Sequence, residues 1–274
     1  ELVHQFNDSG AKAVVVLDQF YDTLQAALPE TGIEHVVVTR AIDLLPQPKK
    51  TLLTAVTKVL GKRPSLPAQG IISFTDMLAG QSAYPSHTPA YDDISALQYT
   101  GGTTGVSKGV MLTQGSLMSN VAQTMDMVSA GGRSVKYFTT VSPLPLYHIY
   151  AWMLNMGLMP ATRGHSVLIP DPRNIPMFVG AIKSLKFEIF CGLNSLFVAL
   201  LEDSKFQKLD FSKLQITLSG GMALMDAVAH EWHEATGCVV SEGYGMTESS
   251  PVISMNPSGH EKIGTAGIPL PGTE

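Results

Sequence analysis

The sequence predicts an α/β protein in which parallel β-sheets are flanked by helices. Short apolar runs rich in valine and isoleucine alternate along the chain with segments of helical periodicity, and this alternation is typical of β-α-β units. Of the 274 residues, 45% are apolar and only 15% are charged, against about 25% in an average globular protein. A chain of this length and composition can bury a large core.

The first β-α-β unit is expected near the N-terminus. AKAVVVL at 11–17 has the continuous apolar character of a strand covered on both faces. A helix follows from about Gln19 to Leu28, Pro29 ends it, and HVVVT at 35–39 is the second strand. We expect residues 1–83 to form part of one subdomain, which includes the basic segment described next.

Residues 46–67, PQPKKTLLTAVTKVLGKRPSLP, form a basic amphipathic segment with five Lys and Arg residues and no Asp or Glu. Its apolar residues recur at helical spacing; they are Leu52, Leu53, Val56, Val59 and Leu60. Such a helix can rest on an anionic membrane surface. The alternative, a helix packed on its own domain with a solvated basic face, is the more common arrangement.

Residues 84–274 are expected to form a second α/β subdomain of the same large domain. A polar loop over 84–93 leads into the strand ISALQYT, and five further strands alternate with helices near 175–185, 194–203 and 222–236. The five strands are KYFTTVSP, HSVLIP, FEIFCG, LQITLSGG and CVVSEGYG. Asp171-Pro172 and Asn194 are predicted helix starts, and Gly237 is a predicted helix stop.

Ligands of parallel sheets bind beyond the carboxyl ends of the strands. Four glycine- or proline-rich segments fall at such ends in the predicted order of elements: 99–109, 142–148, 219–224 and 242–248. The most apolar region, 144–162, is interrupted by prolines and glycine and is too short to span a membrane, so a buried helix is predicted. The net charge of −5 gives no global basic field for nucleic acid.

Cys191 and Cys238 lie far apart in the sequence and are predicted to be inert core thiols rather than a disulfide or a metal site. This use of cysteine fits a reducing compartment, and we expect a cytoplasmic protein. His230 and His233 are spaced H-x-x-H, not H-E-x-x-H, and are interpreted as a solvated helix face rather than zinc ligands.

The run YTGGTTGVSKGVMLT at 99–113 has the composition of a phosphate-binding loop. Glycines let backbone N–H groups point into one concavity, while hydroxyls and a lysine add donors and charge. The lysine does not directly follow a glycine, and VMLT is expected to be a strand, so the run is not a Walker A loop. The residues concerned are Thr100, Gly101, Gly102, Thr103, Thr104, Gly105, Ser107 and Lys108.

This run resembles the phosphate-loop signature of the adenylate-forming superfamily, which includes acyl-CoA synthetases, luciferases and peptide-synthetase adenylation domains. Three further segments are similar to signatures of that superfamily and occur in the same order: PLPLYHIYA at 143–151, SGGMAL at 219–224 and EGYGMTESSPV at 242–252. The sequences between them look most like those of bacterial long-chain fatty-acid–CoA ligases. The resemblance spans essentially the whole chain.

The resemblance implies part of the large N-terminal domain of the adenylate-forming fold, built of layered α/β subdomains, without the small C-terminal domain. It also implies ATP-dependent formation of an acyl-adenylate from a fatty acid, followed by transfer of the acyl group to coenzyme A, with Mg²⁺. Because the family's ribose-binding aspartate, hinge arginine and catalytic lysine are expected beyond Glu274, we expect a central part of that domain, inactive by itself.

The resemblance also implies residue roles. Thr247, Glu248, Lys108 and His148 are the catalytic candidates, and Glu248 and Thr100 the candidate Mg²⁺ ligands. Besides loop 100–108, the candidate nucleotide contacts are Gly220, Gly221, Glu242, Gly243, Tyr244, Gly245 and Thr247. Tyr147, His148 and Trp152 are assigned to the acyl pocket.

Simpler interpretations stay open for several of these residues. His148 can be a core histidine, Trp152 can be core packing, and Glu248 can be a solvated loop residue. A ligase for another carboxylic acid, one that uses an acyl-carrier acceptor, and a non-catalytic nucleotide- or lipid-binding module are the rival functions. The sequence also leaves open a homodimer and peripheral contact of residues 46–67 with the inner face of the membrane.

Overall fold

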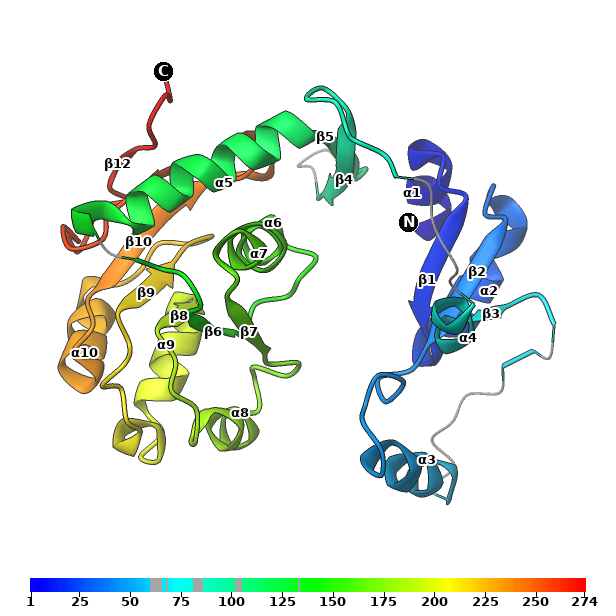
Figure 1. Ribbon diagram of the computed structural model, residues 1–274, viewed down its shortest axis with the longest axis horizontal. Coiled ribbons are helices and arrows are strands. Elements are labelled where there is room, and N and C mark those ends of the chain that lie inside the picture. The colour runs from blue at the N-terminus through cyan, green and yellow to red at the C-terminus, as the bar shows by residue number, and fades with distance from the viewer. Residues whose placement is uncertain (60–65, 68, 81–85, 102–104, 133) are drawn as a thin grey trace. The chain divides into compact units, whose positions relative to one another are not determined.

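The computed structural model (Figure 1) describes residues 1–274 except 60–65, 68, 81–85, 102–104 and 133. The chain divides into two compact units. The first unit consists of residues 1–88 and 99–109, and the second of residues 89–98 and 110–274. The subdomain boundary expected between residues 83 and 84 stays a prediction.

The first unit is built on a parallel sheet with the strand order β1-β2-β3, which confirms the predicted β-α-β unit. Val15 of β1 is paired with Val37 of β2. Tyr21 and Leu24 form the core with alternate valines of both strands. The elements are α1 (Leu2–Ser9), β1 (Ala13–Leu17), α2 (Tyr21–Ala27), β2 (His35–Thr39), α3 (Lys49–Val59), β3 (Ile72–Ser73) and α4 (Phe74–Ala79).

The prediction that residues 11–17 are covered on both faces is wrong. Val14 and Val16 pack on the core, but Val15, on the opposite face of β1, is 59% exposed. Successive side chains of a strand point to opposite faces of the sheet. Helix α4 packs on β2, where Val37 is buried, and this cover does not extend over Val15.

The second unit contains a sheet with the strand order β12-β11-β10-β9-β8-β6-β7. The strands β7, β6, β8, β9 and β10 run parallel, whereas β11 and β12 are antiparallel additions that we did not predict. The strands are β6 (Thr139–Ser142), β7 (His165–Leu168), β8 (Ile189–Gly192), β9 (Ile216–Ser219), β10 (Val240–Gly245), β11 (Val252–Met255) and β12 (Ile268–Pro269). The predicted fold class, parallel strands flanked by helices, is confirmed.

Helices cover both faces of this sheet (Figure 1). Phe178, Phe197 and Trp232 pack from three helices on one face, around Phe190 of β8. These helices are α8 (Ile175–Ile182), α9 (Asn194–Leu201) and α10 (Asp226–Thr236). The other face is covered by α5 (Gln114–Val128) and by a continuous helical segment made of α6 (Ile149–Trp152), a π-helix (Met153–Leu158) and α7 (Met159–Thr162).

One of the three predicted helix boundaries needs correction. Asn174 caps α8 by accepting a hydrogen bond from Met177 N at 3.1 Å, so Asp171-Pro172 lies in the preceding turn. Asn194 starts α9 as predicted, and its side chain accepts a hydrogen bond from Met225 N at 3.0 Å. Gly237 ends α10 as predicted, with φ of 72°.

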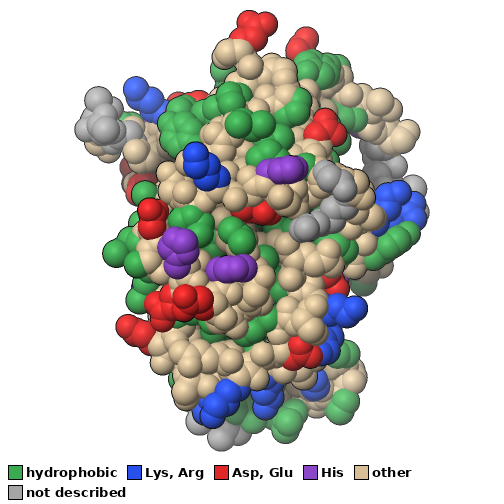
Figure 2. All heavy atoms as spheres, turned by 90° about the vertical axis from the view of Figure 1, so that its left-hand side faces the viewer, with side chains coloured by type: hydrophobic (Ala, Val, Ile, Leu, Met, Phe, Trp, Pro, Cys, Tyr) green, Lys and Arg blue, Asp and Glu red, His purple; other side chains and the backbone are tan. Residues whose placement is uncertain are grey.

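Of the apolar region 144–162, residues 149–162 form the predicted helical segment, which is buried on one side, whereas Leu146 and Tyr147 before it are exposed. Among the helices of the described residues, none combines the length and the apolar character needed to cross a membrane. Cys191 and Cys238 are both buried thiols, as predicted. On the face shown in Figure 2, acidic and basic side chains are interspersed among apolar ones.

Candidate functional site

Three of the four glycine- or proline-rich segments gather at one edge of the seven-stranded sheet. Residues 142–148 begin at the end of β6 and residues 219–224 at the end of β9, and residues 242–248 include the last residues of β10 and the turn after it. The strands β10 and β9 are neighbours, and only β8 separates β9 from β6. Since these strands run parallel, their carboxyl ends meet at the edge where α/β proteins bind ligands. The predicted placement of these three segments is confirmed.

The segment 219–224 passes close to the segment 242–248. A Cβ atom at Gly220 would lie 3.5 Å from the carbonyl oxygen of Gly243 and 3.6 Å from the ring of Tyr150. Gly221 has φ of +82°, a conformation that side chains disfavour. The two backbones therefore approach closely, and larger residues would fill the space beside them.

Glu242 joins these two segments. Its side chain accepts a hydrogen bond from Leu224 N on one oxygen and from Gly264 N on the other, both at 3.3 Å. Its backbone oxygen accepts from Asn256 N at 3.1 Å. The structure thus gives Glu242 a positioning role for the segment after β9, a role that its sequence context did not reveal.

The residues after β10 form a tight turn. A Cβ atom at Gly245 would lie 2.2 Å from the carbonyl oxygen of Pro251, so only glycine fits there. Thr247 begins one 3₁₀ turn, Thr247–Ser249, in which Glu248 is exposed. Tyr244 is half-exposed.

The donor set of this turn suits a hard cation. Glu248 offers an exposed carboxylate and Thr247 an adjacent hydroxyl, and oxygen ligands of this kind are those that Mg²⁺ prefers. His230 and His233, by contrast, are exposed on α10, and the described residues contain no cluster of three metal-ligating side chains. The solvated-face interpretation of these two histidines agrees with their exposure.

The segment 143–151 places His148 at the start of α6. The side chain of His148 caps the helix, with Nδ1 accepting from Tyr150 N at 3.3 Å, and it is exposed rather than buried in the core. Gln98 Nε2 donates to the backbone oxygen of Tyr147. Trp152 is partly buried and packs against Leu112, Leu117 and Ile149.

Beyond Trp152, most apolar side chains of the helical segment belong to the core. Met153, Leu154, Leu158 and Met159 are buried on the sheet, whereas Met156 is 61% exposed. The hydroxyl of Tyr150 is buried beside the thiol of Cys191. Burial raises the pKa of the Tyr150 hydroxyl well above its usual value.

The phosphate-loop candidate belongs to the first unit. Thr100 ends β4 (Ile94–Thr100) and Lys108 begins β5 (Lys108–Thr113); the two strands form a small sheet, so the loop connects two strands as predicted. Gly101 and Lys108 are exposed, and Gly105 has φ of +92°. Gly102, Thr103 and Thr104 lie outside the described residues.

Helix α1 braces this loop, which the sequence did not indicate. His4 Nε2 donates to the backbone oxygen of Ser107 at 2.9 Å, and Gln5 Nε2 donates to Ser107 Oγ at 3.4 Å. Tyr99, at the other end of the loop, donates its hydroxyl hydrogen to Asp8 Oδ2 at 2.7 Å. This bond to Asp8 raises the pKa of the Tyr99 hydroxyl.

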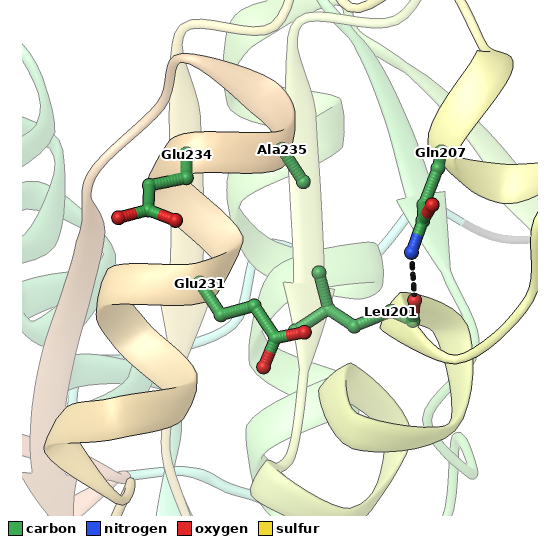
Figure 3. Close-up of a pocket in the computed structure, with 5 residues that line it drawn as sticks. All are labelled: Leu201, Gln207, Glu231, Glu234 and Ala235. Carbon is green, nitrogen blue, oxygen red and sulfur yellow. Dashed lines mark hydrogen bonds between the residues drawn. The ribbon is translucent and has the colours of Figure 1, made fainter.

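A hollow in the second unit lies between α9, α10 and the turn at Gln207 (Figure 3). It has a volume of about 270 Å³ and is lined by Leu201, Gln207, Glu231, Glu234 and Ala235. None of the predicted site residues lines it. The candidate residues of the second unit therefore lie at the sheet edge, and those of the first unit lie in the loop 99–109.

The mainly parallel sheet, with glycine-rich segments at the carboxyl ends of its strands, defines an α/β protein of the adenylate-forming fold. The structure matches the anthranilate CoA ligase AuaEII in complex with anthranoyl-AMP with a TM-score of 0.80 at 23% identity, over 99% of this chain and 48% of that one. It matches ATP-bound MatB from Rhodopseudomonas palustris with a TM-score of 0.74 at 26% identity, over 99% of this chain and 47% of that one.

The family model for the AMP-binding enzyme matches residues 1–274, and the chain belongs to this family. Over 279 aligned residues the chain is 40% identical to the long-chain-fatty-acid–CoA ligase of Haemophilus influenzae; the alignment covers all of this chain and 50% of that protein. The chain thus spans about half the length of the curated relatives it matches.

Proposed function

We propose that the whole protein is an AMP-forming ligase that converts a long-chain fatty acid, ATP and coenzyme A into acyl-CoA, AMP and pyrophosphate. The observation that carries the proposal is the meeting of three family-like segments at one sheet edge, in a chain 40% identical along its whole length to a long-chain-fatty-acid–CoA ligase.

The proposed reaction has two steps. A carboxylate oxygen of the fatty acid attacks the α-phosphorus of ATP, the bond to the β-phosphate oxygen breaks, and pyrophosphate leaves. The sulfur of coenzyme A then attacks the acyl carbon and AMP leaves. Because charge accumulates on the phosphates in the first step, this chain contributes chiefly by positioning groups and neutralising charge.

In this proposal the loop 100–108 holds the β- and γ-phosphates. Exposed Lys108 supplies positive charge, and backbone N–H groups and hydroxyls of the loop supply donors. The contacts of His4 and Gln5 with Ser107 and of Asp8 with Tyr99 tie α1 to the two ends of the loop.

The nucleotide's base and α-phosphate are assigned to the second unit. Tyr244 stacks on adenine, and Gly220, Gly221 and Gly243 leave room for the flat ring. Glu242 keeps the segment 220–224 in place through Leu224 N. Thr247 donates a hydrogen bond to the α-phosphate.

Glu248 and Thr100 are the proposed ligands of Mg²⁺, which when bound offsets negative charge on the phosphates. Tyr147, His148 and Trp152 are assigned to the acyl pocket. His148 is exposed and fixed at the start of α6, as expected of a group that lies between the carboxylate and the phosphates.

The remaining proposals concern coenzyme A and location. Coenzyme A is the acyl acceptor, the protein is cytoplasmic, and residues 46–67 bring it into peripheral contact with the membrane. A homodimer is compatible with these assignments.

The experiment is ATP–pyrophosphate exchange with the full-length protein and fatty acids of graded chain length. Exchange that rises with chain length supports the long-chain assignment. Preference for short or aromatic acids would contradict the long-chain substrate but would still support the proposed reaction. Absence of exchange with every acid would favour a non-catalytic binding module.

A further inference from the structure

The side chain of Asn256 is a buried junction between β10 and the loop that follows β11. Asn256 is 2% exposed. Its Nδ2 donates to the backbone oxygens of Thr265 and Glu242 at 2.7 and 3.3 Å. Its Oδ1 accepts from Lys262 N at 3.1 Å and from Thr265 Oγ1 at 3.3 Å. A primary amide can donate two hydrogens and accept two, so this side chain makes all the hydrogen bonds of which it is capable.

The backbone of Asn256 is bonded to the same strand. Its N–H donates to the carbonyl oxygen of Glu242 at 3.1 Å, and its own carbonyl oxygen accepts from Ser241 Oγ at 2.9 Å. Asn256 therefore holds the start of the loop, residue 256 itself, and its later part, residues 262–265, against β10. A buried polar group whose bonds are all satisfied favours one arrangement of its partners.

The loop in turn supports the carboxylate of Glu242. Gly264 lies between the two loop residues that Asn256 bonds, and its N–H donates to Glu242 Oε1 at 3.3 Å. The other carboxylate oxygen, Oε2, accepts from Leu224 N at 3.3 Å. A continuous series of contacts therefore runs from Asn256 through the loop and Glu242 to the end of the segment 219–224.

We propose that Asn256 is a positioning residue for the adenine of ATP, acting through Glu242 on the segment 219–224. The proposal rests on the proposed function, which assigns glycines of that segment to the adenine site. Without the Asn256 side chain, residues 262–265 lose their attachment to β10, and Gly264 N no longer holds the carboxylate toward Leu224 N. The segment then adopts more conformations, and ATP binds more weakly.

The first test is hydrogen–deuterium exchange of the full-length protein without nucleotide, followed by mass spectrometry of peptides that cover residues 219–225 and 262–266. In Asn256→Ala, the amides of Leu224 and Gly264 should exchange about fivefold faster, the factor that corresponds to one hydrogen bond. Wild-type exchange rates at Leu224 in this variant would overturn the proposal. This test does not depend on which reaction the protein catalyses.

The second test is the KM for ATP in ATP–pyrophosphate exchange. Asn256→Ala should raise it about fivefold and leave the KM for the fatty acid unchanged. Glu242→Ala should raise it as well, and the double variant should exceed Glu242→Ala by no more than about twofold, because both changes break the same series of contacts. Effects that multiply, or a KM for ATP that Asn256→Ala leaves unchanged, would overturn the proposal. Wild-type protein without exchange would overturn the proposed function, and the adenine role of Asn256 with it.

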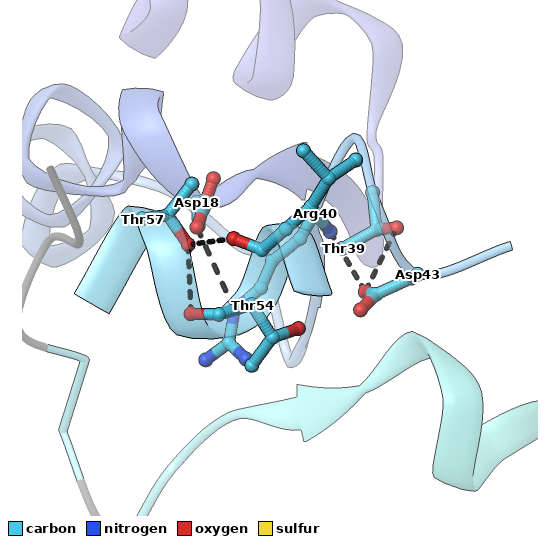
Figure 4. A network of polar contacts seen from close by, with 7 residues as sticks. Asp18, Thr39, Arg40, Asp43, Thr54 and Thr57 are labelled. Carbon is cyan, nitrogen blue, oxygen red and sulfur yellow. Dashed lines mark hydrogen bonds and ion pairs between the residues drawn. The ribbon is translucent and has the colours of Figure 1, made fainter. Parts of the chain in front are cut away.

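Asp43→Ala is the matched control, because the Asp43 carboxylate also joins parts of a turn. In the first unit it accepts from Arg40 N at 2.8 Å and from Thr39 Oγ1 at 3.4 Å (Figure 4), and these three are not predicted site residues. This variant should be less stable than the wild type with the same KM for ATP. An equal rise in KM for Asp43→Ala and Asn256→Ala would show that lost stability suffices, and would overturn the proposal.

A milder variant is available if Asn256→Ala does not fold. Thr265→Val removes the hydroxyl that donates to Asn256 Oδ1 and to the backbone oxygen of Lys262, and it keeps the buried amide. It should raise the KM for ATP about twofold and speed exchange at Gly264 by a similar factor. If both quantities stay at their wild-type values, the proposal is overturned.

Discussion

The side-chain amide of Asn120 pairs with the backbone of Val252 through two hydrogen bonds. Nδ2 donates to the carbonyl oxygen at 2.7 Å, and Oδ1 accepts from the backbone N–H at 3.0 Å. Asn120 is buried on α5, and Val252 starts β11, directly after the turn that carries Glu248. One amide thus fixes the end of the proposed metal-binding segment to the long helix of the second unit.

Replacing Asn120 by Asp should destabilise the protein. The carboxylate cannot donate to the Val252 oxygen, which would be left buried without its partner, at a cost of about 1–3 kcal/mol. Urea unfolding of the full-length protein measures this change in the free energy of unfolding. Asn7→Asp is the matched control, because Asn7 makes one exposed bond to Glu30 and its loss should cost less than about 1 kcal/mol. Equal effects of the two substitutions would contradict the assigned role of Asn120.

Gly245→Ala should disrupt the turn after β10. The added methyl group would lie 2.2 Å from the carbonyl oxygen of Pro251, so the backbone must shift, and we expect a cost of more than about 2 kcal/mol. Gly180→Ala is the control, because Gly180 is at an exposed position of α8 where a Cβ atom meets nothing within 4 Å; the substitution should be neutral or stabilising by up to about 1 kcal/mol. Thermal unfolding distinguishes the two variants. If Gly245→Ala leaves the stability unchanged, the turn has room for a side chain beside Pro251.

Weakening the brace of the phosphate loop should affect ATP more than the fatty acid. His4→Ala removes the hydrogen bond to Ser107 O, and we expect the KM for ATP to rise about threefold to tenfold, the range of one hydrogen bond. The KM for the acid should stay the same. His35→Ala, a change at another exposed histidine of the first unit, is the control in the same kinetic assay. If His4→Ala leaves the KM for ATP unchanged, the hydrogen bond between His4 and Ser107 does not contribute to ATP binding.

The buried thiol of Cys191 should make the protein less stable as pH rises above 9. Burial raises the pKa of the Cys191 thiol to about 12 from its ordinary value of 9.0. As pH rises, the thiol loses its proton in the unfolded chain before it does so in the folded protein. The contribution of Cys191 to the free energy of unfolding is therefore complete below pH 9 and is lost as pH rises toward 12. Urea titrations across this window should show a steeper decline for the wild type than for Cys191→Ala, each relative to its own stability at pH 8. If the stability of the wild type and of Cys191→Ala falls equally with pH, the Cys191 thiol is not the cause of the decline.

Local patterns were sufficient for the order and type of the main elements. The apolar runs that became β6, β8, β9 and β10 carry the signature of buried parallel strands, and glycines at their carboxyl ends locate the sheet edge. These features depend on neighbours in the sequence, which is why they could be predicted.

Contacts between distant residues could not be predicted in this way. Asn120 and Val252 are 132 residues apart, and His4 and Ser107 are 103 apart, so no local pattern marks them as partners. The exposure of Leu52 and Val56 on α3 could not be predicted either. Periodicity shows that a helix is amphipathic, but it does not show which face packs on the rest of the protein. Asn174 was missed as a helix cap because Asp171-Pro172 offers a competing start three residues earlier.

The most direct test of the central claim is ATP–pyrophosphate exchange by the full-length protein carrying Glu248→Gln, with a long-chain fatty acid as substrate. The account predicts acid-dependent exchange by the wild type and a fall of about 100-fold or more in kcat for the variant. Glu231→Gln, on an exposed face of α10, should leave the rate at the wild-type value. Exchange by Glu248→Gln at the wild-type rate would contradict the account.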